Sequence, residues 1–303
     1  MTTDGRTGCL GRNVTPLVVL VLVALHPVSA WTCSPSRGNL LVTDLGAASI
    51  VSIDPDTGSG CTVTAGGLLA LPVGLSIAQN GDLIVADADA LGGNGAIVRV
   101  DPRSGSQRLV SSGRYFVDPA AVVVGSDGAF YVADANAFGG GGGIIRVDPA
   151  TGRQTITSSG GAFAQPIGIA GGRNGQLYVA DREALAVLRV GSAATQQVVS
   201  RRARLSNPIG ILMGDDGGLY VADADAFGGV AGAIIRIDPR TGKQAVLASG
   251  HDLVSPVAIA MAGGKLFVVD YAAMVVVDPR TGAQTSHPWS SDLIAPWAIA
   301  VVP

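Results

Sequence analysis

The chain has 303 residues, of which 48% are hydrophobic and 14% are charged, and its formal net charge is −3 at pH 7. A disordered polymer needs low hydrophobicity with high net charge, and a nucleic-acid surface needs clustered Lys and Arg, so the composition excludes the first and argues against the second. The 43 glycines lie among turn-like neighbours along the chain, which indicates many tight turns rather than a flexible linker.

Residues 1–30 have the pattern of a secretory signal peptide. Arg6 and Arg12 give a positive start, an unbroken apolar run follows at Leu17–Leu25, and small residues end the segment before Trp31. The run is shorter than the roughly 20 residues that a membrane span needs, although a membrane anchor is the alternative interpretation. We therefore expect a secreted or periplasmic protein that has no membrane span after cleavage.

Cleavage would remove Cys9 and leave Cys33 and Cys61 in the mature chain. Two cysteines in an exported protein predict one disulfide, here joining the mature N-terminus to the end of the first repeat. A loop of 28 residues between positions 33 and 61 would be stabilised by about 3–4 kcal/mol in the chain-entropy model. Two unpaired buried thiols are the alternative. The residues before Cys33 make a poor lipoprotein cleavage site, which disfavours a lipid anchor.

One repeat of about 45 residues dominates the rest of the chain. Its anchor is an apolar segment that ends in aspartate, and its clearest copies are Leu177–Asp181 and Leu219–Asp223, both Leu-Tyr-Val-Ala-Asp. The copies are spaced by 42 to 47 residues and end at Asp44, Asp87, Asp134, Asp181, Asp223 and Asp270. Six copies at such a period predict a repeat architecture.

Each repeat predicts four short strands, which we name A to D in chain order. Strand A follows a proline, as at Pro166–Ala170, and strand B is the anchor. Strand C, as at Ile144–Asp148, ends in Asp-Pro-x-Thr-Gly, where Pro pre-sets φ and Gly accepts the left-handed position. Strand D is a Gln-x-x-x-x-Ser stretch, as at Gln154–Ser159. Four strands per repeat of this length, with no helical period, are typical of a propeller blade.

The two ends of the chain predict how the ring closes. The repeats begin at a strand B, Leu40–Asp44, with no strand A before it, and they end with an unpaired strand A at Pro296–Val301. Joining these segments completes one blade and avoids an open sheet edge between the chain ends. We therefore expect residues 31–303 to form a single all-β domain, a six-bladed β-propeller with four-stranded antiparallel blades.

The motifs Pro-x-Gly-Ile-Ala, Gly-x-Leu-Tyr-Val-Ala-Asp and Ile-x-Arg-Val-Asp resemble the NHL repeat, over nearly all of Arg37–Pro303. The chain is also similar to the six-bladed propellers of streptogramin B lyase and the gluconolactonase/regucalcin (SMP-30) family. The resemblance implies the fold strongly and the function weakly, because this scaffold hosts unrelated activities. Gluconolactonase-like enzymes hold a divalent metal on Glu, Asn and Asp in the channel, and streptogramin B lyase uses His and Glu with Mg²⁺. This chain departs from both, since its only glutamate, Glu183, has no His in a matching motif.

The D–A and B–C loops of a propeller share one face, here called the top face, where binding residues are expected. An aspartate present in every repeat is best interpreted as structural, capping the turn after strand B. Three B–C loops are longer than the others and alternate oxygen-bearing side chains among glycines, a pattern that suits Ca²⁺. The metal candidates are Asp87, Asp89, Asp134, Asn136, Asp223 and Asp225. The alternative is an Asx-turn whose Leu or Phe fills a gap between blades.

Groups for acid–base chemistry are sparse. His251 lies beside Asp252 in a D–A loop, and alignment with the last repeat sets Asp252 opposite Asp292. A histidine near carboxylates could act as a general base, so these three residues are the catalytic candidates, with a solvated loop histidine as the alternative. The other top-face candidates, for ligand contact, are Arg114, Tyr115, Arg182, Glu183 and Tyr271.

These patterns favour an exported, monomeric binding module that holds a protein or small-molecule ligand on its top face, with no cofactor required. The alternative is a divalent-metal-dependent hydrolase, lactonase-like, or a lyase acting at the top of the central channel. A structural protein of the cell envelope is a third hypothesis. The sequence carries no phosphate-binding motif, because the Gly139–Gly143 run lies in a hairpin loop and opens no helix.

Overall fold

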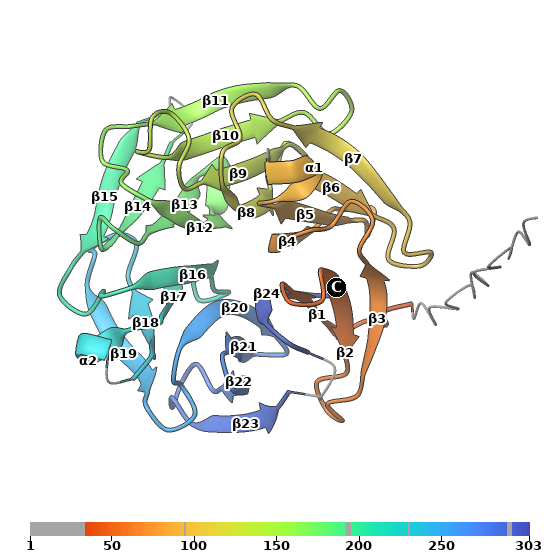
Figure 1. Cartoon of the computed structure of the whole chain (residues 1–303). Helices are drawn as coiled ribbons and strands as arrows, with labels where there is room; N and C mark the ends of the chain where they lie inside the picture. The colour runs from red at the N-terminus through yellow and green to blue at the C-terminus, as the bar shows by residue number, and fades with distance from the viewer. Residues whose placement is uncertain (1–33, 94, 192–194, 230, 290–292) are drawn as a thin grey trace, which may run out of the picture. The chain divides into compact units, whose positions relative to one another are not determined.

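Six four-stranded antiparallel sheets stand around a central channel in the computed structural model (Figure 1). The structure describes residues 34–303 except 94, 192–194, 230 and 290–292. The predicted six-bladed β-propeller is confirmed. The signal peptide, Cys33 and Asp292 lie outside the described residues, so the calls on export and on the disulfide stay predictions.

Each blade runs outward from an inner strand A to an outer strand D, in chain order except where blade 1 begins with the last strand. Blades 1 to 3 are formed by β24 (Pro296–Val301), β1 (Leu40–Asp44), β2 (Ser49–Ile53) and β3 (Gly60–Ala65); by β4 (Pro72–Ile77), β5 (Leu83–Asp87), β6 (Ala96–Val100) and β7 (Gln107–Ser112); and by β8 (Pro119–Val124), β9 (Phe130–Asp134), β10 (Gly143–Val147) and β11 (Gln154–Ser159). Blades 4 to 6 are formed by β12 (Pro166–Gly171), β13 (Leu177–Asp181), β14 (Ala186–Val190) and β15 (Gln196–Arg201); by β16 (Pro208–Met213), β17 (Leu219–Asp223), β18 (Ala233–Ile237) and β19 (Gln244–Ser249); and by β20 (Pro256–Ala262), β21 (Lys265–Asp270), β22 (Ala273–Val277) and β23 (Gln284–Pro288). Short helical turns occur at α1 (Ala90–Gly93), η1 (Arg173–Gly175) and α2 (Ala226–Gly229).

The ring closes through the last strand, as predicted. β24 pairs antiparallel with β1, with Leu40 opposite Val301 and Val42 opposite Ile299. Blade 1 therefore combines the two ends of the described chain. This pairing satisfies the edge of β1 that would otherwise be open.

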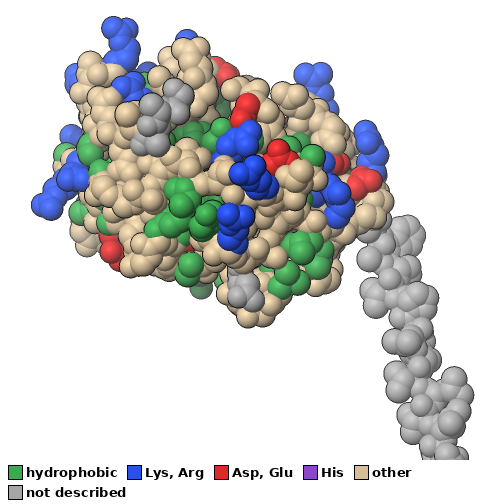
Figure 2. All heavy atoms as spheres, turned by 90° about the horizontal axis from the view of Figure 1, so that it is seen from above, with side chains coloured by type: hydrophobic (Ala, Val, Ile, Leu, Met, Phe, Trp, Pro, Cys, Tyr) green, Lys and Arg blue, Asp and Glu red, His purple; other side chains and the backbone are tan. Residues whose placement is uncertain are grey.

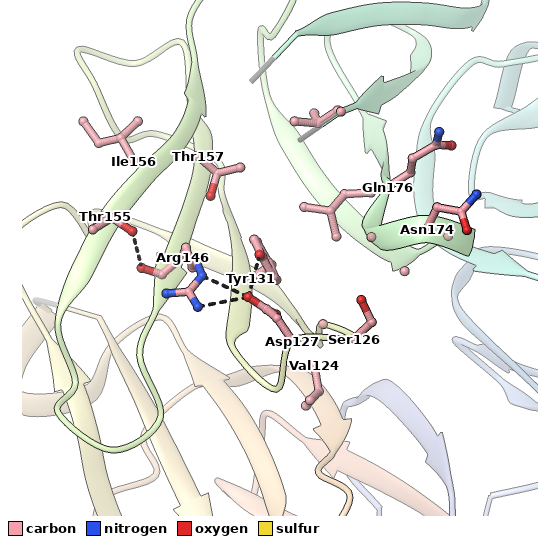
Figure 3. Close-up of a pocket in the computed structure, with 17 residues that line it drawn as sticks. Val124, Ser126, Asp127, Tyr131, Arg146, Thr155, Ile156, Thr157, Asn174 and Gln176 are labelled. Carbon is pink, nitrogen blue, oxygen red and sulfur yellow. Dashed lines mark hydrogen bonds and ion pairs between the residues drawn. The ribbon is translucent and has the colours of Figure 1, made fainter. Parts of the chain in front are cut away.

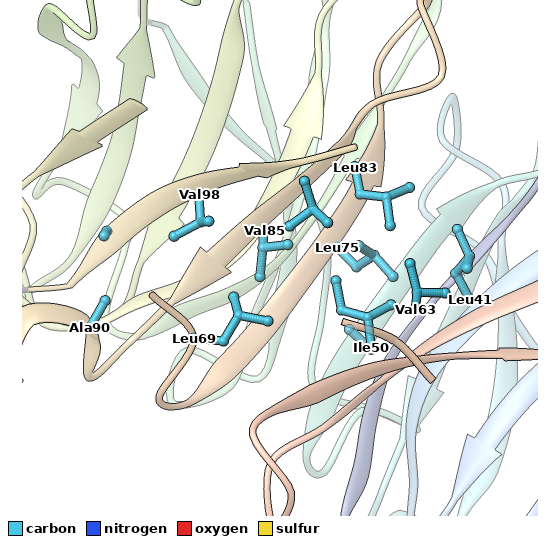
Figure 4. Packing of buried hydrophobic residues seen from close by; sticks show 12 residues of the cluster. Leu41, Ile50, Val63, Leu69, Leu75, Leu83, Val85, Ala90 and Val98 are labelled. Carbon is cyan, nitrogen blue, oxygen red and sulfur yellow. The ribbon is translucent and has the colours of Figure 1, made fainter. Parts of the chain in front are cut away.

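The hydrophobic core is divided among the six interfaces between neighbouring blades. Between blades 1 and 2, Leu41, Ile50 and Val63 pack against Leu75 and Val85 (Figure 4). Five equivalent clusters fill the other interfaces. Because a blade presents apolar side chains on both faces of its sheet, it can bury them only when it has a neighbour on each side.

A glutamine at the start of strand D joins each of four blades to the preceding blade. Gln154, only 3% exposed, donates from Nε2 to Ser111 Oγ and to the Gly113 carbonyl, both at 3.0 Å. Its Oε1 accepts the Tyr115 N–H at 3.0 Å. The equivalent residues that make the same kind of contact are Gln107, Gln196 and Gln244. The first residue of strand D, the glutamine, therefore serves the interface with the preceding blade, and the hydroxyl residue four positions later serves the interface with the following blade.

Two interfaces depart from this pattern. Gln284 of blade 6 faces Ala248 where the other blades offer a hydroxyl, and its Nε2 donates to the Ser249 carbonyl at 3.4 Å. Its Oε1 is buried with no hydrogen-bond partner. In blade 1 the glutamine position is held by Gly60. The hydrogen bonds made by the strand D glutamine are therefore weakest at the two interfaces of blade 6, with blade 5 and with blade 1.

Candidate functional site

The recurring aspartate at the end of strand B holds the loops of the top face in place. In all six blades this aspartate is 0% exposed, and its oxygens accept two N–H groups of the D–A loop at 2.7–3.1 Å. Asp134 also accepts the N–H groups of Asn136 and Ala137 in its B–C loop, at 3.2 and 2.9 Å. The structural interpretation of this aspartate is confirmed.

Burial dominates the electrostatics of these carboxyl groups. It raises the pKa of Asp134, Asp223 and Asp270, while the N–H groups that they accept act in the opposite direction. Asp87, Asp134 and Asp223 were candidates for calcium ligands. Their oxygens point into the backbone of the loops rather than toward a shared site.

The other three calcium candidates lie at the exposed ends of the longer B–C loops. Asn136 Nδ2 donates to Asp118 Oδ2 at 2.9 Å, and Asp225 Oδ2 accepts from Asn207 Nδ2 at 2.6 Å. Asp89 is exposed. Within the described part of the chain, no three acidic, His or Cys side chains are grouped as a metal site would require. Calcium binding stays a prediction, and the contacts favour the Asx-turn interpretation.

The catalytic candidates do not form a constellation in the described residues. His251 is exposed, adopts a positive φ of 51°, and makes no hydrogen bond or ion pair with any residue that the structure describes. Asp252 is half-buried beside it. A general base needs a positioned partner, so a solvated loop histidine is the interpretation that these contacts favour.

The ligand-contact candidates fall on separate blades. The Arg114 guanidinium lies 4.7 Å over the Tyr115 ring and donates to its hydroxyl at 3.3 Å. Arg182 donates to Gln165 Oε1 at 2.6 Å, next to the exposed Glu183. Tyr271, on blade 6, is 82% exposed. Of these candidates, Arg114 and Tyr115 are the two that contact each other through a hydrogen bond or a ring contact among the described residues.

The top face has a polar part and an apolar part. On blades 3, 4 and 5 the residue before the strand A proline pairs with a B–C loop side chain, as Asp118–Asn136, Gln165–Arg182 and Asn207–Asp225. On blades 6 and 1 these positions hold Ser255 and Ala295, and the exposed side chains nearby include the apolar Val254 and Ile294 beside His251. Ile294 lies over Gly46 of the adjacent B–C turn, where a Cβ would come within 2.6 Å of it.

Exposed large hydrophobic side chains gather on this face. Eight occur in the described chain, and five of them belong to top-face loops: Leu91, Val117, Val254, Tyr271 and Ile294. The other three lie at one position of strand D, as Leu109, Ile156 and Val198. Sequence reasoning missed Val117, Val254 and Ile294, although each stands two residues before a strand A proline and could have been found by that spacing.

The central channel is lined by apolar inner strands. Its upper part has a volume of about 100 Å³ and its lower part about 330 Å³. Ser76 is the one polar side chain along these walls in the described chain, apart from the indole of Trp297. The channel walls therefore present no carboxylate, imidazole or amide side chain among the residues that line these two parts.

A cavity of about 610 Å³ lies on the opposite face, which is formed by the A–B and C–D loops. It lies between blade 3 and blade 4 (Figure 3). On its blade 3 wall, Asp127 Oδ2 accepts from Arg146 Nη2 at 2.9 Å, from Arg146 Nε at 3.2 Å and from the Tyr131 hydroxyl at 3.2 Å. Sequence reasoning did not predict a site here, because it considered only the top face.

On the side of the ring that Figure 2 shows, Lys and Arg side chains are interspersed with acidic and hydrophobic ones. No helix in the described part of the chain is long and apolar enough to cross a membrane. No family model matches the chain, and no curated protein matches it.

Solved structures show the same fold. A chain in the crystal structure of a nidogen/laminin complex matches with a TM-score of 0.72 and 14% identity, over 88% of this chain and 98% of that chain. Virginiamycin B lyase from Staphylococcus aureus matches in a catalytically inactive form with quinupristin, with a TM-score of 0.59 and 18% identity over 88% of this chain and 92% of that chain. Its selenomethionine form matches with a TM-score of 0.62 and 19% identity, over 88% and 86%. This chain therefore has the six-bladed β-propeller fold of these solved structures.

Proposed function

We propose that this protein is an exported, non-catalytic binding module whose top face holds a protein partner. The observation that carries the proposal is that five of the eight exposed large hydrophobic side chains of the described chain belong to top-face loops, and three of these, Val254, Tyr271 and Ile294, lie on the adjacent blades 6 and 1. Exposed apolar patches rimmed by polar groups are typical of protein interaction sites. On this face the patch on blades 6 and 1 lies next to the polar pairs of blades 3 to 5, which would give a partner both apolar burial and oriented hydrogen bonds.

Two further observations support binding over catalysis. The six buried aspartates hold the loops rigidly to the sheets, and a surface that is ordered before binding loses less entropy on association. Among the described residues, His251 makes no hydrogen bond or ion pair with a carboxylate, and the channel walls are apolar. Among proteins of this fold, the nidogen/laminin structure is that of a complex between proteins.

The experiment places a photo-crosslinking amino acid at Tyr271 and uses the mature protein as bait in the extracellular and envelope fractions of its source. We expect one crosslinked partner, whose capture is abolished by the double substitution Val254→Ser, Ile294→Ser. The matched control is Ile156→Ser, Val198→Ser, which removes exposed aliphatic side chains from the rim instead. The proposal would be overturned if the unsubstituted bait, the Val254/Ile294 variant and the control variant captured the partner equally. Crosslinks only to a second copy of the chain would also overturn it.

A further inference from the structure

The cavity between blades 3 and 4 is lined by a glycine at a position where the other blades carry a side chain. Gly171 is the last residue of strand A in blade 4 and lines both this cavity and the lower end of the channel. In the other five blades the sixth residue from the strand A proline is a bulky aliphatic one, namely Ile77, Val124, Met213, Met261 and Val301. Blade 4 is therefore the one blade of the ring that lacks a side chain at this position.

Neither backbone conformation nor packing requires glycine at this position. Gly171 is absent from the residues with positive φ, so a side chain would meet no backbone strain. A Cβ added to it would have Val123 Cγ2 as its only near neighbour, at 3.7 Å, which is an ordinary van der Waals contact. The glycine thus leaves open space in the cavity. Glycine loses more conformational entropy on folding than any other residue, so a glycine that the fold does not require is a candidate for a functional role.

A second departure from the repeat lies on the facing wall. Thr157 of β11 occupies a strand D position that is aliphatic in four other blades, as Val63, Val110, Val199 and Leu247. It is half-buried, and its hydroxyl makes no hydrogen bond to any described residue. An isosteric valine would satisfy the fold equally well, so the hydroxyl is available to a ligand.

The remaining polar groups of the cavity are neutral in sum and offer both donors and acceptors. Arg146 is paired with Asp127, and its Nη1 has no partner among the described residues (Figure 3). Asn174 and Gln176 stand on the blade 4 wall opposite, with Leu177 buried between the two walls. Planar amide, guanidinium and carboxylate groups can each bridge two neighbouring hydroxyl groups of a ligand, because their atoms lie in one plane at fixed spacing.

We propose that this cavity is a binding site for a neutral sugar unit, either a free monosaccharide or one unit of a glycan. A sugar ring carries many hydroxyl groups, each both donor and acceptor, and no charge, which matches the lining. The cavity volume of 610 Å³ falls in the range of about 300–1,000 Å³ that small-molecule sites occupy. The site is on the face opposite the proposed partner surface, and the proposal does not depend on that function.

Blade 5 provides an internal control. It repeats the same contacts, with Asp216 accepting from Arg236 Nη2 at 2.7 Å and from the Tyr220 hydroxyl at 3.1 Å. Its next blade carries Met261 where blade 4 has Gly171. The Asp–Tyr–Arg contacts therefore form without the glycine, and Gly171 beside them is what distinguishes the blade 3 site.

The test uses the mature protein and saturation-transfer NMR with isothermal titration. The probes are the methyl glycosides of glucose, galactose, mannose, xylose and N-acetylglucosamine, and trimers of the same sugars. Gly171→Val and Thr157→Val each restore the residue of the repeat, so we expect melting temperatures at or above that of the wild type. We also expect each to weaken the binding of the preferred sugar by about tenfold or more, the cost of a filled site or of one or two lost hydrogen bonds.

Asp127→Asn and Asp216→Asn form the matched pair, since both disturb the same contacts and only the first lies in the cavity. Loss of sugar binding in Asp127→Asn but not in Asp216→Asn supports the site. Tighter binding of a trimer than of its monomer indicates a glycan chain as the source, and equal binding indicates a free sugar. Absence of binding by every probe, unchanged binding in Gly171→Val and Thr157→Val, or equal losses in the aspartate pair would overturn the proposal.

Discussion

At the residue scale, the buried aspartate of strand B decides the geometry of the top face. The carboxylate of each copy takes the place of the water that would otherwise accept hydrogen bonds from several loop N–H groups. Asp134, for example, accepts four of them. An unpaired buried donor costs more than a hydrogen bond contributes on average, so these six side chains are the least replaceable polar groups of the chain.

Substituting Asp134→Asn is expected to lower the free energy of unfolding by about 2–4 kcal/mol, because the amide has one acceptor oxygen and turns an N–H group toward a backbone N–H. Urea unfolding followed by fluorescence measures the change. Asp89→Asn, on an exposed loop position, is the control and should leave stability nearly unchanged. A change of similar size in both variants would contradict the capping role.

At the scale of the element, the outer strands carry the connections between blades. The Asp-Pro-x-Thr-Gly turn that precedes strand D packs directly on the preceding blade. Gly152 shows why its last position is glycine, since its φ is 69° and a Cβ would lie 2.1 Å from the Val110 carbonyl oxygen. The glutamine that follows the turn then hydrogen-bonds to the same neighbouring strand, so turn and strand D form one unit of contact.

The strength of this connection can be changed in both directions. Gln154→Ala should lower the free energy of unfolding by about 2–4 kcal/mol, because it removes three hydrogen bonds and leaves buried partners unpaired. Ala248→Ser should raise it by about 1 kcal/mol by giving Gln284 the hydroxyl partner that the other blades have. Chemical denaturation of both variants measures these changes. If Ala248→Ser lowered the free energy of unfolding, the missing hydroxyl at position 248 would not be the reason for the weak contact of Gln284.

The turns before strand D also set part of the dependence on pH. Backbone N–H groups two and three residues further along the chain hydrogen-bond to the aspartate of each turn and lower its pKa. These aspartates are Asp54, Asp101, Asp148, Asp238 and Asp278. A carboxyl group with a lower pKa in the folded state stabilises the fold above its unfolded pKa of about 3.9, and this contribution is lost as the pH falls. The raised pKa of the buried Asp134 acts in the opposite direction.

Asp238→Asn should therefore show a smaller loss of stability than the wild type when the pH is lowered from about 5 to about 3. Unfolding by urea at several pH values in this window gives the two slopes. Asp215→Asn removes an acidic side chain that lies outside these turns and serves as the control. If the free energy of unfolding of Asp238→Asn changed with pH as steeply as that of the wild type, the Asp238 carboxylate would not contribute to the pH dependence of stability.

At the scale of the whole molecule, stability depends on closing the ring. The β24–β1 pairing joins the two chain ends, yet the interface between blades 6 and 1 lacks an interblade glutamine because Gly60 takes its position. Cys61 is the next residue, at the exposed start of β3. A disulfide from Cys61 would strengthen the blade in which the side-chain contact is missing.

We expect non-reducing peptide mapping of the mature protein to show Cys33 joined to Cys61. The double substitution Cys33→Ser, Cys61→Ser should then lower the free energy of unfolding by about 3–4 kcal/mol, the loop entropy of a 28-residue closure. Reduction of the wild type should give the same decrease. Alkylation of both cysteines without prior reduction would contradict the pairing.

The repeat allowed the architecture to be predicted because each copy states the same local rules. Proline before strand A and an apolar strand B recur in all six copies, and an Asp-Pro-x-Thr/Ser-Gly turn recurs in five of them, with Gly191 in place of the aspartate in blade 4. Each follows from backbone chemistry, and six copies with a split first blade leave one way to close the ring. The role of the aspartate was predictable for the same reason, since a residue present in every blade serves the blade.

The sites were less predictable, because they depend on residues that break the repeat and on distances between blades. Oxygen-bearing side chains in the B–C loops suggested a metal, and the structure shows Asn136 paired to Asp118 across 18 residues of sequence. Gly171 and Thr157 look ordinary in the sequence and lie in different blades. The chain by itself therefore determined the blades and their number, since these follow from local patterns, while the tertiary structure alone decided which exposed groups share a surface, because that depends on how neighbouring blades pack.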